Sequence, residues 1–154
     1  LVWAIFFVQG KGGNVIEDKT DNRDSDEKLV EIEMELLDIL EDSNGRSELW
    51  EFLESLRVKA ATNKDARIQY KQISLYIQLL EDNGTRLNEN ITKHLDDDIW
   101  ELRPGNNRVL YFYFKNDTFV LLHQFRKKTQ KTPKREIERA KAERDDYLAR
   151  KEAE

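Results

Sequence analysis

The chain has 154 residues, with 26 Lys and Arg against 31 Asp and Glu, so its formal net charge is −5. Cysteine is absent, and no unbroken apolar run approaches the roughly 20 residues of a membrane span, which excludes disulfide-stabilised and membrane-anchored classes. A chain of this length buries roughly 70% of its unfolded surface. We therefore expect one folded domain in a reducing cytoplasm, with no membrane contact.

The first segments offer no site. Residues 1–8, "LVWAIFFV", predict a short strand. They do not fit a secretory signal, because they lack the basic region before the apolar run and a convincing small-residue cleavage site after it. Residues 9–28 are rich in Gly, Asn, Asp and Lys and predict a linker or mobile loop. The next stretch, "KLVEIEMELLDILED", leaves two structures open. Leu29, Ile32, Leu36 and Leu40 suit one face of a helix, while "ELLDIL" suits a short strand.

Two helices are predicted after this stretch. Asn44-Gly45 is a turn signal, and Ser47 is placed to cap a helix whose apolar face is Leu49, Phe52, Leu53 and Leu56. The second helix is expected from about Asp65 to Glu81, ended by Asn83-Gly84, with an apolar stripe of Ile68, Ile73, Tyr76, Ile77 and Leu80. Their short connection predicts an αα-hairpin packed on an apolar surface.

The second half of the chain supplies that surface. "DIWELRP", "RVLYFYFKN" and "TFVLLHQFRKK" are rich in β-branched and aromatic residues, and the short turns "PGNN" and "KND" join them, which predicts an antiparallel meander. Tyr111 and Tyr113 alternate with Leu110, Phe112 and Phe114, so whichever set faces the helices belongs to the core, and an exposed tyrosine is a candidate for stacking a base. After Pro133, a highly charged helix is expected from about Lys134 to Lys151, mostly solvated, with a thin apolar side of Ile137, Ala140 and Leu148.

Charge is divided unevenly along the chain. Residues 1–84 carry 10 Lys and Arg against 18 Asp and Glu, whereas residues 85–154 carry 16 against 13. Residues 101–135 concentrate the excess, with nine basic side chains against two acidic ones. This imbalance predicts a local cationic surface on an acidic protein, suited to a polyanion.

The sequence resembles a known family in this same region. The run from "IWELRPGNNRVLYFYFKN" through "FRKKTQKTPKREIERAKAERDDY", with "NGRSELWEFL" upstream, is similar to the HigB-type toxins of the RelE/ParE superfamily over roughly residues 34–150. The resemblance implies an α+β, RelE-like fold: a small antiparallel sheet with an αα-hairpin packed on it and a C-terminal helix. It also favours a strand for residues 36–40. Met34 stands where such a chain is expected to start, so we expect an N-terminal extension at 1–33 and a toxin domain at 34–154.

The resemblance further implies a function. HigB-type toxins cut messenger RNA on the ribosome, and they need neither metal nor cofactor, because the RNA's own 2′-OH attacks the neighbouring phosphate. The protein positions that phosphate and stabilises its added charge. The partners implied are mRNA, the ribosome and a helix-turn-helix antitoxin, expected in a heterotetramer. Arg suits such a site because its planar fork engages two phosphate oxygens at once.

Site residues follow from matching positions in the family motif. The catalytic candidates are Arg103, Arg108, His123, Arg126, Lys127 and Lys128, and the RNA-binding candidates are Lys93, Lys131, Lys134 and Arg135. Arg108 matches the family arginine that opens a strand. The RelE branch has lysines, one of them a base, where this chain has Ile99 and Glu101. The general base is therefore open between His123, Glu101 and Lys128, and His123 also suits a hydrogen-bonded structural role.

Two other classes of function remain. A non-catalytic RNA- or DNA-binding module uses the same cations, but needs a groove-entering helix or an aromatic platform. A silent member of the same fold acts only as an antitoxin-interaction protein, and a variant acts on gyrase. Cleavage of ribosome-bound mRNA separates the toxin ribonuclease from all of these.

Overall fold

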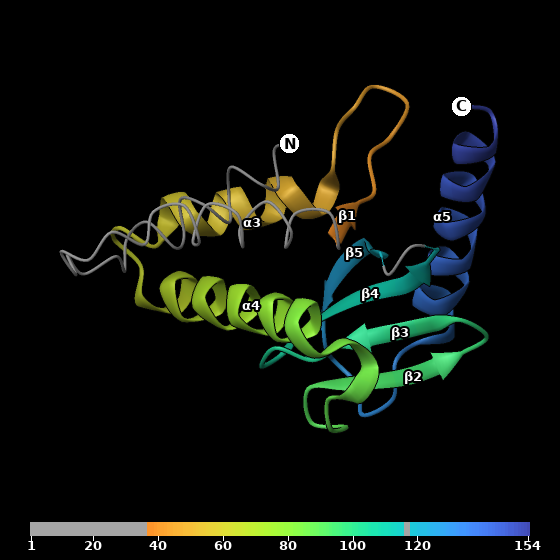
Figure 1. Cartoon of the computed structure of the whole chain (residues 1–154). Coiled ribbons are helices and arrows are strands. Elements are labelled where there is room, and N and C mark those ends of the chain that lie inside the picture. Colours follow the sequence, from red (N-terminus) through yellow and green to blue (C-terminus); the bar gives the residue numbers. More distant parts are fainter. Residues whose placement is uncertain (1–36, 116–117) are drawn as a thin grey trace, which may run out of the picture.

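The computed structural model describes residues 37–115 and 118–154 (Figure 1). The strand predicted for residues 1–8, the linker at 9–28 and the boundary at Met34 lie outside the described residues. The strand favoured for residues 36–40 is confirmed as β1 (Leu37–Ile39).

The fold is α+β, as predicted. The described strands form one mixed sheet in the order β1-β5-β4-β3-β2. The predicted meander is confirmed as β3 (Ile99–Leu102), β4 (Asn107–Phe114) and β5 (Thr118–Arg126), with antiparallel pairing throughout. Two strands extend it. β1 adds to β5 in parallel, and the polar edge strand β2 (Thr92–Asp96), absent from the sequence prediction, adds to β3.

Two helices cover one face of this sheet (Figure 1). α3 (Glu48–Lys59) begins at the predicted cap, where Ser47 Oγ accepts a hydrogen bond from the Trp50 amide at 3.1 Å. α4 (Lys64–Asn83) is capped in the same way by Asn63 and ends at Gly84, whose φ of +59° suits glycine. A short 3-10 helix, η1 (Gly84–Arg86), leads on towards β2.

The first core lies between these helices and the sheet. Ile73, Ile77 and Leu80 of α4 are fully buried there, beside Leu53 of α3. The assignment of Ile68 to this stripe is wrong, because its side chain is 46% exposed. The buried line of α4 begins instead at Ala66, and Ile68 is rotated away from it around the helix.

The opposite face of the sheet carries a second core under α5 (Lys134–Glu152). Ala140 and Tyr147 of this helix are buried against Leu110, Phe112 and other sheet residues. The expectation of a mostly solvated helix therefore underestimates its packing, since Tyr147 was not recognised as a core residue. No helix in the described ranges is long and apolar enough to cross a membrane.

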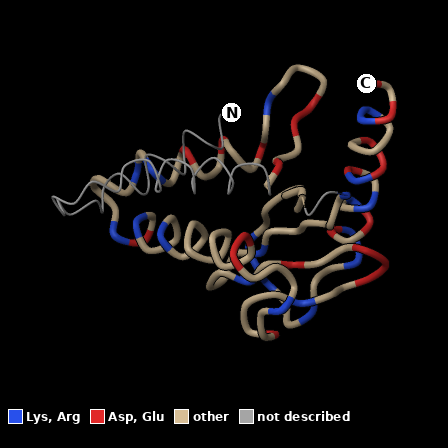
Figure 2. Tube along the Cα trace, in the orientation of Figure 1, with Lys and Arg blue, Asp and Glu red and all other residues tan. Residues whose placement is uncertain are grey.

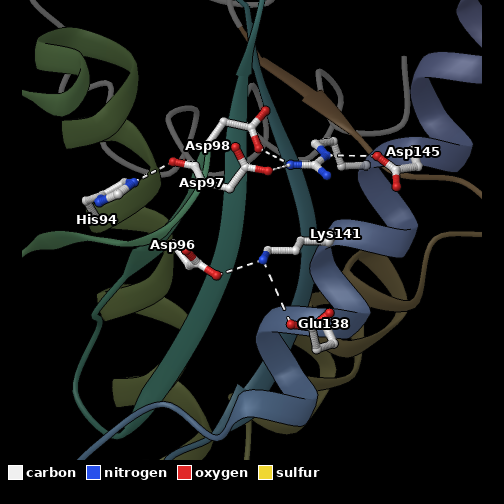
Figure 3. A network of polar contacts seen from close by, with 8 residues as sticks. His94, Asp96, Asp97, Asp98, Glu138, Lys141 and Asp145 are labelled. Carbon is white, nitrogen blue, oxygen red and sulfur yellow. Dashed lines mark hydrogen bonds and ion pairs between the residues drawn. The ribbon is translucent and has the colours of Figure 1, made fainter.

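Ion pairs fasten α5 to the β2–β3 turn (Figure 3). Arg144 Nη1 lies 2.9 Å from an Asp97 carboxylate oxygen and also pairs with Asp98. Lys141 Nζ lies 2.7 Å from Asp96 Oδ2. Asp97 adopts a φ of +53°, a left-handed conformation that Asp tolerates in tight turns. The helix is therefore held by its apolar face and by a polar clasp at the sheet edge.

Candidate nucleic-acid site

Most of the predicted cations meet where three strands end. Asn107 and Arg126 are direct partners in the β4–β5 register, as are Arg108 and Phe125, and the Lys127 amide donates to the Asn106 carbonyl at 2.7 Å. Arg103 follows β3 at this same edge. Figure 2 shows basic segments gathered beneath α4, where the strand ends lie, whereas the β2–β3 turn at the right is acidic.

The sheet divides this cluster between its two faces. Arg108 and Lys127 line a small hollow on the α5 side, closed by Phe125 and the loop of residues 129–133. Arg126 points to the other face, where its Nη1 donates to Gln69 Oε1 of α4 at 3.2 Å. Lys128 is exposed. Of the three consecutive cations, Lys127 is therefore the one that shares a surface with Arg108.

Arg108 is held by the backbone that precedes it. Its Nη1 donates to the Gly105 carbonyl at 2.9 Å and to the Asn107 carbonyl at 2.8 Å, and the residue is only 6% exposed. Burial lowers the pKa of its guanidinium; nearby Glu101 opposes that shift and Arg103 adds to it. Nε and Nη2 donate to no described residue. This Nε–Nη2 edge is therefore without a hydrogen-bond partner among the described residues, in a residue that is almost fully buried.

Glu101 lies beside these arginines as a carboxylate that is 3% exposed. Its Oε1 is 3.4 Å from Arg103 Nε, and its Oε2 accepts a hydrogen bond from Thr132 in the loop before α5. Arg103 is itself tethered, because its Nη1 donates to the Glu89 carbonyl at 2.6 Å. Among the three candidates for the general base, Glu101 is the one placed among the arginines.

His123 lies under α5 rather than on the surface. It is fully buried, with Nε2 2.8 Å from Glu136 Oε2 and Nδ1 hydrogen-bonded to Glu143. Both carboxylates belong to α5, so the imidazole fastens this helix to β5. That placement favours the structural role and leaves RNA no direct access to the ring.

The RNA-binding candidates surround the hollow. Lys131, Lys134 and Arg135 are exposed along the loop and the first turn of α5. Lys93 on β2 is the direct cross-strand partner of Glu101, so both side chains project from the same face of the sheet. Tyr113 is the exposed tyrosine and Tyr111 the buried one, but Tyr113 lies five residues along β4 from Arg108, about 17 Å away.

Other site residues were missed by the sequence prediction. Thr132 contacts Glu101, and Gln69 contacts Arg126. Each is distant in the chain from the residue that it contacts, and neither matches a motif. The separation of Arg126 from Lys127 follows from strand alternation, and it was predictable once Arg108 is paired with Phe125. No group of His, Asp and Glu in the described part of the chain is arranged to hold a metal ion.

The α+β fold is consistent with a RelE-like fold and carries a cationic edge at its strand ends. The chain belongs to the phage-derived Gp49-like protein family (DUF891), whose family model matches residues 51–145. This family is RelE/toxin-like. The matched range runs from α3 into α5 and includes every candidate site residue. Among curated proteins, none matches the chain.

Proposed function

We propose that this protein is the toxin of a type II toxin–antitoxin module, a HigB-type endoribonuclease that cuts mRNA on the ribosome without a metal. One observation carries the proposal: Arg108 and Lys127 line one hollow, on the sheet face where Arg103 holds Glu101. Cations with a free donor edge and a neighbouring carboxylate are what attack by a 2′-OH on a phosphate requires.

The reaction assigns a task to each group. Glu101 takes the proton of the 2′-OH as its oxygen bonds to phosphorus. Arg108 binds two oxygens of the phosphorane, and Lys127 donates a proton to the 5′-oxygen as the bond from phosphorus to that oxygen breaks. The products are a 2′,3′-cyclic phosphate and a 5′-hydroxyl, so atoms and charges balance. Arg103 pairs with the Glu101 carboxylate and helps to fix its position.

Access to Glu101 depends on the loop before α5. Thr132 donates to Glu101 Oε2, and the carboxylate is almost fully covered. Binding of the RNA backbone to Lys131 in this loop draws the loop outward in the proposal, which frees Glu101 to meet the 2′-OH. The loop thereby links binding to catalysis.

The same cations suit an inhibitor. A helix-turn-helix antitoxin silences the toxin by laying an acidic segment over Arg103, Arg108 and Lys127, since a cationic site attracts carboxylates and steers their association. Membership of the Gp49-like family supports such a partner.

The test is primer extension on a reporter mRNA in a ribosome-containing extract. Wild-type protein should produce new 5′ ends within the coding region. Arg108→Ala should lower the cleavage rate by about 100- to 1,000-fold, as loss of one charge-stabilising donor does elsewhere. Glu101→Gln, which keeps the volume and the Thr132 contact, should lower it by about 100-fold or more.

Lys134→Ala is the matched control, because it removes an exposed cation outside the hollow and should keep most of the activity. Circular dichroism checks that each variant is folded. Unchanged mRNA in the presence of folded wild-type protein and translating ribosomes would exclude the ribonuclease and leave a non-catalytic role.

A further inference from the structure

Asn107 and Arg108 are neighbours in β4, and they face opposite sides of the sheet. Arg108 lines the hollow on the α5 side. Asn107 faces α4, where its Nδ2 donates to Gln69 Oε1 at 3.0 Å and its Oδ1 accepts from Gln124 Nε2 at 2.9 Å. Because Asn107 is only 2% exposed, an unpaired amide there is costly, and these two bonds fix the side chain.

The turn between β3 and β4, together with Asn107, supplies both acceptors of Arg108. Gly105 and Asn107 offer their carbonyls to Arg108 Nη1, and the Asn107 amide closes the turn onto the Pro104 carbonyl at 3.0 Å. A displacement of Asn107 therefore moves the carbonyls that orient the guanidinium.

Helix α4 touches this turn at two points. Gln69 holds Asn107, and Gln72, nearly one helical turn further on, packs over Gly105 so closely that a Cβ there would lie 2.6 Å from Gln72 Oε1. Gln69 is itself fixed, since its Nε2 donates to Asp65 Oδ2 at 2.6 Å. Its amide oxygen is thus aimed at Asn107.

We infer that Gln69 is a positioning residue: through Asn107 it sets the β3–β4 turn, and with it the orientation of Arg108 towards the RNA phosphate. The inference rests on the ribonuclease site proposed above. Gln69 does not touch RNA, because it lies on the other face of the sheet. A purely structural role predicts lost stability with an unchanged reaction rate, whereas positioning predicts a slower reaction with unchanged binding.

Two substitutions of Gln69 separate these roles. Gln69→Leu keeps much of the volume and removes the acceptor for Asn107. Gln69→Glu, made together with Asp65→Asn because Gln69 Nε2 donates to the Asp65 carboxylate, keeps an acceptor oxygen towards Asn107 and Arg126 and serves as the conservative rescue. Lys71→Leu is the control, an exposed position on the same helix. Gln124→Met removes the other bond to Asn107 and serves as a second variant if Gln69→Leu does not fold.

The first readout is single-turnover cleavage of mRNA on purified ribosomes, together with ribosome affinity. Gln69→Leu should slow cleavage by about 10- to 100-fold, as small misplacements of a catalytic group do, with affinity within about twofold of wild type. Gln69→Glu/Asp65→Asn and Lys71→Leu should cleave within about threefold of wild type. Wild-type cleavage by Gln69→Leu, or equal losses in Gln69→Leu and Gln69→Glu/Asp65→Asn, would overturn the inference.

The second readout does not depend on activity. The Nε–Hε signal of Arg108 in a ¹⁵N NMR spectrum should shift or broaden in Gln69→Leu and remain in place in Gln69→Glu/Asp65→Asn and Lys71→Leu. An unchanged signal in Gln69→Leu would refute the positioning role. If wild-type protein does not cut RNA, the proposed function fails, but this spectrum still decides whether Gln69 orients Arg108.

Discussion

At the scale of single residues, neighbours along the chain do different work because a strand sends them to opposite faces. Arg126 joins the amides of α4, while Lys127 joins Arg108 in the hollow. Hydrogen bonds then decide orientation. Thr92 Oγ1 donates to the Glu101 carbonyl at 2.9 Å, so Tyr111 must be the donor in its 2.6 Å bond to that hydroxyl.

This arrangement predicts a loss of stability in alkali. Burial raises the pKa of Tyr111 from 10.0 to about 12. The unfolded chain therefore ionises first, and the contribution of Tyr111 to the free energy of unfolding, complete below pH 10, should fall by up to about 2–3 kcal/mol between pH 10 and 12.

Urea unfolding at a series of pH values, compared with Tyr111→Phe, measures this effect. Below pH 9 the variant should be less stable by about 1 kcal/mol, the value of one buried hydrogen bond. The gap should narrow or reverse above pH 10. A gap that stays constant to pH 12 would show that Tyr111 ionises alike in both states.

At the scale of elements, the sequence predicted what local signals encode. Ser47 and Asn44-Gly45 mark the start of α3, and the aromatic and β-branched runs mark β3 to β5. β2 was missed because "TKHLD" has no apolar alternation; as an edge strand with one neighbour, it is defined by its pairing with β3.

The candidate site was predicted less completely than the fold. The sequence motif brought Arg103, Arg108 and Lys127 to one edge, but it did not separate the buried His123 from exposed groups. The partners of His123, Glu136 and Glu143, lie 13 and 20 residues away on another element. Such contacts depend on how α5 crosses the sheet, which no local pattern records.

The polar clasp of α5 makes a prediction at this scale. Arg144 is 12% exposed and pairs with Asp97 and Asp98. Arg144→Ala removes both ion pairs and should lower the free energy of unfolding by about 1–2 kcal/mol. The loss is no larger because the two aspartates remain largely solvated without their partner. Amide hydrogen exchange should accelerate in α5 and in the β2–β3 turn before it does in β4.

Arg150→Ala on the same helix is the control. Its pair with Asp146 is a surface i,i+4 contact and should cost only about 0.3–0.5 kcal/mol, without faster exchange in the β2–β3 turn. Equal effects of the two substitutions would mean that α5 is held by its apolar face alone.

At the scale of the whole molecule, the chain joins an acidic half to a basic one. Residues 85–154 contribute the strand-end cations, while α3 and α4 lie in the acidic half. A net charge of −5 therefore does not oppose RNA binding, because phosphates respond to the local surface within about a Debye length of 8–10 Å.

The exposed cations outside the hollow should determine how RNA binding depends on salt. Lys134 and Arg135 are exposed at the start of α5, outside the hollow, so each should contribute about one phosphate contact to affinity and little to the reaction itself. The double variant Lys134→Ala/Arg135→Ala should reduce the log–log salt slope of single-stranded RNA binding by about 1.4, since each contact on a single strand accounts for about 0.7. Lys59→Ala/Lys64→Ala, an equal charge change on the connection between α3 and α4, should leave the slope unchanged. Fluorescence anisotropy with a labelled oligonucleotide between low and physiological salt measures the slopes. If both double variants flatten the slope equally, binding follows net charge and the strand-end surface has no special part in it.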